Sequence, residues 1–256
     1  MPKIVELLGA SGVGKSSLYY SLQKKWEKKD NWAIYHDFIY KRKDKSLVSI
    51  MLKLKSFLYK VSETDYHWND GKIADHKKEF AVKYSDFIAV FLDLVNEKAK
   101  YGFDGVDKRF FMIFYMLKSI ERLHNVIEKK SDERVCLIDE ALLSRIMHLN
   151  SPDFTQNDLL SYLDAMPLPD AVIYLHAPAD QIIHRIRKRD RTSTLHAGME
   201  EVDILKYTVD TQQLMEYSLD ILKGKGVSIL RLDAGQSLSA LTSESVSFLN
   251  QLYLSS

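Results

Sequence analysis

Five short runs of apolar residues lack the alternation of polar and apolar positions that a half-exposed strand shows. They cover residues 4–8, 32–36, 135–138, 171–175 and 227–232. Uninterrupted apolar runs of this length are typical of strands covered on both faces. Segments with helical spacing of apolar residues separate the runs, which favours a parallel sheet joined by right-handed crossovers. The pattern therefore predicts an α/β fold with a five-stranded parallel sheet flanked by helices.

The interval between the second and third runs is much longer than the others. Its apolar pattern is helical over residues 45–62, 73–100 and 107–130. We therefore predict one domain over residues 1–256, with a helical insertion at 41–131 that forms the wall of an acceptor site. No internal repeat or Pro/Gly-rich linker indicates a second domain. The apolar insertion helices would also suit a homodimer.

The segment after the first strand, GASGVGKS at residues 9–16, matches the pattern G-x-x-x-x-G-K-[ST]. Glycines let successive backbone N–H groups point into one concavity, and the following helix start adds unpaired donors. In this pattern Lys15 contacts the β- and γ-phosphates, and the Ser16 hydroxyl binds Mg²⁺. The segment predicts a nucleoside-triphosphate site. The residues expected to bind the nucleotide are Gly9, Ser11, Gly12, Val13, Gly14, Lys15, Ser16 and Ser17.

Two carboxylates, Asp139 and Glu140, follow the third strand. If this strand lies beside the phosphate-loop strand, Asp139 is placed to hold Mg²⁺ directly or through water. Capping of the next helix, expected at residues 142–149, is the alternative role for Asp139. Glu140 has three open roles, which are activation of water for hydrolysis, binding of a substrate hydroxyl, and helix capping.

Asp37 follows the second strand, at the sheet edge where ligands of open parallel sheets bind. Its carboxylate is a candidate base for the hydroxyl that attacks the γ-phosphate. His36 is the competing base, and adjacent strand positions point to opposite faces, so we expect only one of the two to face the site. A turn-forming role for Asp37 remains open.

An arginine-rich segment, RIRKRDR at residues 185–191, ends the helix that follows Pro178. Arg185 and Arg189 share one helix face, where they would neutralise charge on the transferring phosphoryl group. The polar residues 192–198 then suggest a loop that closes over the phosphates, so residues 178–200 are predicted to form a lid. The alternative is a solvated basic helix end that stabilises the helix dipole.

Composition adds limits on partners and location. The formal net charge is +1, which indicates neither nucleic acid nor an anionic membrane as a partner. The single cysteine, Cys136, lies in an apolar run and is expected to be a buried thiol. No apolar run is long enough for a membrane span, and no signal sequence precedes the first strand, so we predict a cytoplasmic protein.

These motifs resemble the P-loop nucleoside and nucleotide kinase family, above all thymidylate kinases and deoxynucleoside kinases. The resemblance rests on the phosphate loop, Asp139, the segments 169–178 and 185–191, and the tail LDAGQS at 232–237. It implies a P-loop NTPase three-layer sandwich that uses ATP and Mg²⁺ and holds a small-molecule phosphate acceptor between insertion and lid. By residue match, Lys15, Ser16 and Asp139 take the phosphate and metal roles. Arg185, Arg189 and Arg191 match the lid arginines, and Asp37 matches the strand-end base loosely.

Two further positions bear on the ligands. The small-residue turn with Ala234 is a candidate surface for a purine base, although an ordinary turn has the same composition. Related kinases usually carry arginine where this chain has Glu140, which removes a positive charge near the acceptor and favours a neutral or non-nucleotide one. Arg109 and Arg145 are candidates to contact acceptor charge or are surface residues.

The motifs together predict an ATP- and Mg²⁺-dependent phosphotransferase, a P-loop kinase whose acceptor is a nucleoside or nucleotide. The alternative from a different class is a P-loop ATPase or nucleotide switch that acts through a protein partner. In that alternative, Asp139 and Glu140 are the metal-binding and water-activating acids.

Overall fold

Strand β1 (Lys3–Leu8), which carries the phosphate loop, is the centre of a five-stranded parallel sheet. The computed structural model describes residues 1–27, 29–39, 79, 81–98, 109–151, 153–188 and 199–255. The strand order is β2-β3-β1-β4-β5. The other strands are β2 (Trp32–Ile34), β3 (Val135–Ile138), β4 (Ala171–His176) and β5 (Ser228–Asp233). The predicted α/β fold with five parallel strands is confirmed.

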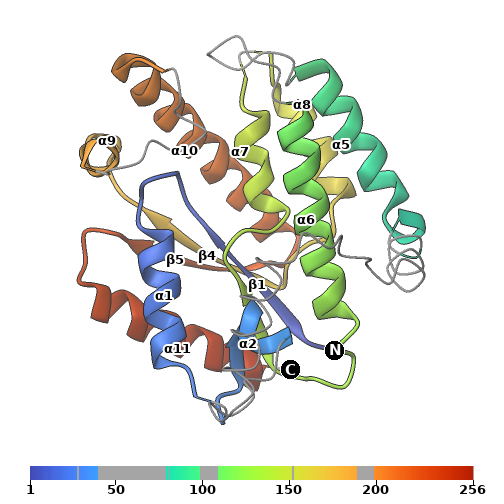
Figure 1. Cartoon of the computed structure of the whole chain (residues 1–256), viewed down its shortest axis with the longest axis vertical. Helices are drawn as coiled ribbons and strands as arrows, with labels where there is room; N and C mark the ends of the chain where they lie inside the picture. Colours follow the sequence, from blue (N-terminus) through green and yellow to red (C-terminus); the bar gives the residue numbers. More distant parts are fainter. Residues whose placement is uncertain are drawn as a thin grey trace, which may run out of the picture.

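Helices cover both faces of the sheet, as Figure 1 shows. On one side α1 (Lys15–Lys25) packs against α11 (Leu238–Leu254). On the other side lie α7 (Ile146–Leu149), α8 (Gln156–Ala165) and α10 (Glu201–Gly224), with α5 (Ser85–Lys98) and α6 (Arg109–Ile127) beside them. The remaining described elements are α2 (Tyr35–Ile39), the 3₁₀ turn η1 (Leu143–Arg145) and α9 (Ala179–Arg187). Every residue of β3 is buried, which explains the unbroken apolar run there.

The second strand is shorter than predicted. It ends at Ile34, and Tyr35 and His36 begin α2 instead. Among the described strands, β2 lies at the edge of the sheet and pairs with β3 alone. Beyond Ile34 the chain packs against α6. The Tyr35 hydroxyl accepts a hydrogen bond from Asn125 Nδ2 of that helix at 3.2 Å. The Arg122 guanidinium also lies 5.6 Å from the centre of the Tyr35 ring. Contacts with a helix thus replace strand pairing.

Several of the predicted helical segments correspond to helices of the structure. The helix after the phosphate loop begins at Lys15, and the helix expected at 142–149 consists of η1 followed by α7. Within the predicted insertion, α5 and α6 match the second and third helical segments. The segment 45–62 lies outside the described residues. None of the described helices combines the length and apolar character that a membrane crossing requires.

Candidate active site

The phosphate loop has the strand, loop and helix arrangement that its sequence predicts. Gly9, Gly12 and Gly14 have φ angles of 152°, 97° and 120°, values that L side chains rarely adopt. Gly14 is the N-cap of α1, so Lys15 and Ser16 stand in the first turn of the helix. The Lys15 ammonium donates to the carbonyls of Gly9 at 2.6 Å and Ala10 at 3.1 Å. This cation therefore lies across the loop, where phosphate oxygens would bind.

Gly9 has no room for a side chain. A Cβ there would lie 2.4 Å from the carbonyl oxygen of Leu175 in β4 and 2.9 Å from Cγ1 of Val13. The first of these contacts is with the main chain of a paired strand of the sheet, which cannot move aside easily. The loop therefore depends on glycine at this position for its path over β4.

We expect Gly9→Ala to displace the loop and to remove nucleotide binding. Backbone strain of this kind costs about 1–3 kcal/mol, which would appear as a lower free energy of unfolding. Denaturant unfolding and titration with an ATP analogue measure the two effects. Gly224→Ala is the matched control, because a Cβ at Gly224 meets nothing within 4 Å. Native analogue affinity in Gly9→Ala would show that the loop tolerates a side chain.

Asp139 follows β3 directly, and β3 is the neighbour of β1 in the sheet, with Ile138 opposite Glu6. The Asp139 carboxylate thus emerges at the same edge of the sheet as the phosphate loop. Its Oδ1 accepts a hydrogen bond from Arg122 Nη1 of α6 at 3.0 Å. Desolvation raises the pKa of the Asp139 carboxyl, and the charge of Arg122 opposes this rise.

The oxygen donors at this edge suit Mg²⁺. The ion prefers carboxylate and hydroxyl oxygens, and it usually takes one or two protein ligands together with substrate phosphates. Asp139 supplies a carboxylate, and Ser16 supplies an exposed hydroxyl in the first turn of α1. Within the described ranges, no three His, Cys, Asp or Glu side chains group together as a metal site. The residues present therefore fit Mg²⁺ bound jointly by the protein and a nucleotide.

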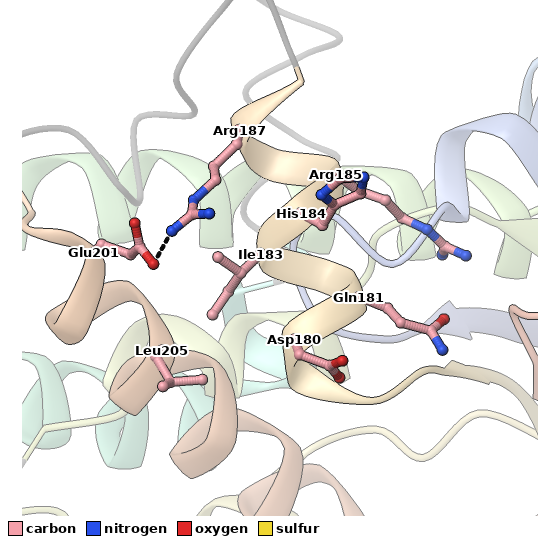
Figure 2. A pocket seen from close by; sticks show the side chains of 8 residues that line it. All are labelled: Asp180, Gln181, Ile183, His184, Arg185, Arg187, Glu201 and Leu205. Atoms are coloured by element: carbon pink, nitrogen blue, oxygen red, sulfur yellow. Dashed lines mark ion pairs between the residues drawn. The ribbon is translucent and has the colours of Figure 1, made fainter.

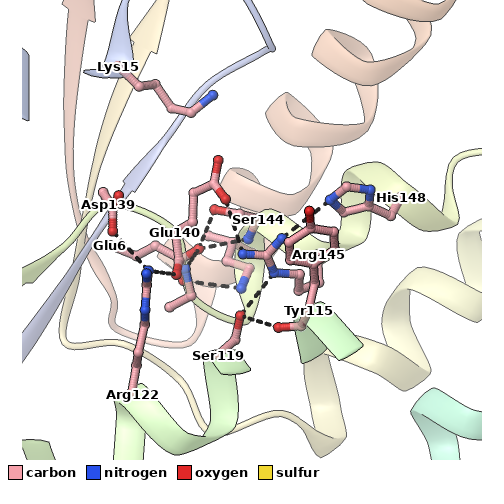
Figure 3. Close-up of polar contacts among 12 residues, drawn as sticks. Glu6, Lys15, Tyr115, Ser119, Arg122, Asp139, Glu140, Ser144, Arg145 and His148 are labelled. Atoms are coloured by element: carbon pink, nitrogen blue, oxygen red, sulfur yellow. Dashed lines mark hydrogen bonds and ion pairs between the residues drawn. The ribbon is translucent and has the colours of Figure 1, made fainter. Parts of the chain in front are cut away.

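Glu140 belongs to a polar cluster centred on the buried guanidinium of Arg145 (Figure 3). Arg145 Nη2 donates to Glu140 Oε2 at 3.1 Å, and Nε donates to the Ser119 hydroxyl at 2.9 Å. Nη1 lies 3.4 Å from Nε2 of His148, and the guanidinium lies 5.4 Å from the centre of the Tyr115 ring. Ser119 and Tyr115 come from α6, so the insertion helix is tied to the residue after Asp139.

Each of the two carboxylates after β3 has an arginine partner. Glu140 was expected to leave the acceptor region short of positive charge. In the structure Arg122 pairs with Asp139 and Arg145 pairs with Glu140, so two guanidinium groups stand beside the two carboxylates. Each of these ion pairs is formally neutral, so the preference for a neutral or non-nucleotide acceptor remains a prediction. Arg145 is a buried residue rather than a surface one.

The guanidinium of Arg185 binds main-chain carbonyls. The predicted lid role had it contact the phosphates instead. Its guanidinium donates to Val13 in the phosphate loop at 2.7 Å and to Ala234, after β5, at 2.9 Å. The turn with Ala234 is thereby joined to the phosphate loop through α9. Arg189 and Arg191 lie outside the described residues, and their lid roles remain predictions.

Helix α9 also borders a pocket of about 560 Å³ that lies between α9 and α10 (Figure 2). Arg187 and Glu201 form an ion pair at this pocket. Arg185 also lines the pocket, but its side chain runs in the opposite direction from that of Arg187. The two arginines are two positions apart on one helix and have different partners. Arg185 joins the loops of the site, and Arg187 lies on a largely exposed surface.

We expect Arg185→Ala to loosen the phosphate loop and to raise the KM for ATP. Hydrogen bonds from a charged group contribute about 1.5–3 kcal/mol, so the free energy of unfolding should fall by a similar amount. Arg187→Ala is the matched control, because exposed ion pairs contribute about 0–1 kcal/mol. Steady-state kinetics and denaturant unfolding distinguish the variants. A lower kcat with unchanged stability and ATP affinity would instead restore the predicted lid role.

Asp37 and His36 lie on α2 and differ in exposure. The side chain of Asp37 is 1% exposed and that of His36 is 64% exposed, with His36 Nδ1 at 3.7 Å from Asp37 Oδ1. The expected alternation of the two side chains does not apply, because both residues lie on a helix and not on a strand. A buried carboxylate on a helix that packs against α6 remains our candidate base.

Sequence reasoning missed Glu6 and Arg122. Glu6 is buried and accepts hydrogen bonds from the turn that follows β3. A lone carboxylate inside the apolar run of β1 was a usable signal for Glu6. Arg122 had no such signal, because an arginine on a helix is ordinarily a solvated residue.

Solved structures, but no sequence family, resemble this chain. No protein-family profile matches the chain, and no curated protein matches it. Deoxyadenosine kinase from M. mycoides with the products dCMP and a flexible dCDP has a TM-score of 0.50 at 18% identity, covering 97% of this chain and 99% of that chain. The M. mycoides enzyme with dCTP gives 0.47 at 16% identity over 97% and 99% of the chains, and with dATP 0.48 at 16% over 96% and 99%. The chain shares the deoxynucleoside kinase fold over nearly its whole length.

Proposed function

We propose that this chain is an ATP- and Mg²⁺-dependent phosphotransferase whose acceptor is a nucleoside or nucleotide. The observation that carries the proposal is the meeting of two elements at one sheet edge. The phosphate loop with Lys15 follows β1, and Asp139 follows the neighbouring strand β3. The deoxynucleoside kinase fold supports the choice of acceptor class.

Different residues of the chain have different roles in the proposed phosphoryl transfer. The loop N–H groups and Lys15 hold the β- and γ-phosphates in line with the acceptor. Ser16 and Asp139 would hold Mg²⁺, which neutralises phosphate charge when bound. The acceptor oxygen forms a bond to the γ-phosphorus while the bond to the β–γ bridging oxygen breaks, and ADP leaves. Asp37 is the proposed acceptor of the hydroxyl proton.

The acceptor side of the proposed site is the wall formed by α6 and the cluster around Arg145. Figure 3 shows the carboxylate of Glu140 directed toward the side on which Lys15 lies. Arg145 fixes one oxygen of this carboxylate at 3.1 Å. We assign Glu140 the binding of an acceptor hydroxyl, a role in which an oriented carboxylate is useful.

The test is ADP production from ATP by the purified protein with Mg²⁺, alone and with a panel of nucleosides, nucleotides and small hydroxylated metabolites. Slow background turnover that one acceptor strongly stimulates, with a phosphorylated product, supports the proposal and identifies the substrate. Steady hydrolysis that is independent of any acceptor, and that Glu140→Gln removes, would favour the ATPase alternative.

A further inference from the structure

We infer that Glu6 is a positioning residue that fixes the turn after β3 relative to the phosphate loop. The inference rests on the proposed function, because it assigns Glu6 a part in the geometry of that site. Glu6 lies on β1 opposite Ile138, the last residue of β3. Its side chain is therefore next to the point where the chain leaves the sheet and presents Asp139.

The carboxylate of Glu6 accepts four hydrogen bonds from this turn. Oε1 accepts from the Ala141 amide at 3.0 Å, the Ser144 amide at 2.7 Å and the Ser144 hydroxyl at 2.6 Å. Oε2 accepts from the Leu143 amide at 3.1 Å. All four partners are donors, which is the set that an ionised carboxylate requires. One buried side chain thus fixes the turn between Asp139 and Arg145.

Strand β1 carries both Glu6 and the phosphate loop. Three residues beyond Glu6, β1 leads into the phosphate loop at Gly9. The bonds from Glu6 reach the turn that begins with Asp139 and Glu140 and ends with Arg145. The phosphate loop and the carboxylate turn follow different strands, and Glu6 connects them directly through one side chain.

Core stability alone does not explain a carboxylate at this position. Glu6 is 2% exposed, and its neighbours Val5 and Leu7 are both fully buried and apolar. Burial raises the pKa of the Glu6 carboxyl, and the hydrogen bonds from Ser144, Ala141 and Leu143 oppose that rise. Buried charges are costly and are often replaceable by apolar residues without loss of stability. Precise placement of the turn is the function that an apolar residue cannot supply.

Glu6→Gln is the test, because it keeps the shape but replaces one acceptor oxygen with an NH₂ group, which can only donate. We expect faster hydrogen exchange at the amides of Ala141, Leu143 and Ser144. We also expect the Mg²⁺ concentration for half-maximal binding of a non-hydrolysable ATP analogue to rise about tenfold or more. Analogue affinity without Mg²⁺ should stay within about twofold, because the phosphate loop itself is untouched. Faster exchange with an unchanged Mg²⁺ dependence would make Glu6 a structural residue only and overturn the inference.

Ser144→Ala covers the case in which Glu6→Gln does not fold. It removes one of the four donors without leaving a buried charge unpaired, and a smaller shift in the same Mg²⁺ dependence is expected. Ser245→Ala is the matched control, because its buried hydroxyl donates to Leu241 O at 2.7 Å within α11, away from the site. If Ser144→Ala and Ser245→Ala both leave the Mg²⁺ dependence unchanged, the inference is wrong.

The binding readout separates this inference from the proposed function. It needs no acceptor, so a wild-type protein that binds the analogue with Mg²⁺ but phosphorylates nothing contradicts the proposed function alone. Wild-type binding of the analogue that does not respond to Mg²⁺ would overturn the inference.

Discussion

Replacing Lys15 with alanine is expected to lower the rate of phosphoryl transfer by about a hundredfold to a thousandfold. The ammonium lies over the phosphate loop, 2.6 Å from the Gly9 carbonyl and 3.1 Å from the Ala10 carbonyl. Phosphate oxygens would replace these carbonyls as its partners when nucleotide binds. The charge is then aimed where negative charge accumulates during transfer. The measurement is kcat at saturating ATP and acceptor.

The fold should survive this change. Lys15 is only partly buried and stands in the first turn of α1, where alanine has a high helix propensity. Thermal melting of Lys15→Ala should therefore resemble that of the native protein. Lys24→Ala, on the same helix but exposed, is the matched control and should keep full activity. An unchanged kcat in Lys15→Ala would remove the phosphate loop from the mechanism.

Replacing Asp139 with asparagine is expected to reduce kcat by at least on the order of a hundredfold at ordinary Mg²⁺ concentrations. Asparagine keeps the size and one acceptor oxygen but loses the negative charge that holds the ion. Raising Mg²⁺ should restore part of the activity, because the nucleotide phosphates remain as ligands. A Mg²⁺ titration of the rate measures both effects.

Two further variants show whether this loss comes from the metal or from the ion pair. Arg122→Gln breaks the contact with Asp139 but leaves the carboxylate, so it should keep Mg²⁺ binding. Asp153→Asn removes an exposed carboxylate elsewhere and should behave as the native protein. If Asp139→Asn keeps the native Mg²⁺ profile, another group holds the ion.

Much of the fold could be predicted from the sequence, because the strands and the phosphate loop are each encoded by a short stretch of neighbouring residues. A strand covered on both faces needs an unbroken apolar run, and β1, β2, β3 and β4 are buried in this way. The fifth run also corresponds to a strand, but β5 lies at the edge of the described sheet and only its Leu232 is buried, so the expected cover on both faces was wrong there. The phosphate loop is encoded by consecutive residues, so its glycines and the start of α1 follow from sequence. The end of β2 was not readable, because Tyr35 and His36 are compatible with a strand until contacts with α6 are known.

The positions of site residues that directly follow a strand were predictable from the sequence. The contacts that site residues make with residues of other elements were not. Asp139 could be placed beside the phosphate loop once β1 and β3 were expected to be neighbours. Arg185 was predicted to face the phosphates, but its partners are two carbonyls in loops far apart in sequence. No spacing rule connects those positions.

The sequence by itself thus determined the α/β class, the phosphate loop and the carboxylate that follows β3, because each depends on neighbouring residues. The tertiary structure decided the partners of the charged side chains. It paired Arg122 with Asp139 and Arg145 with Glu140. It also placed the Glu6 carboxylate against the turn that runs from Asp139 to Arg145. These contacts join residues from separate elements, and a buried charge is stable only where distant donors and counter-charges meet it.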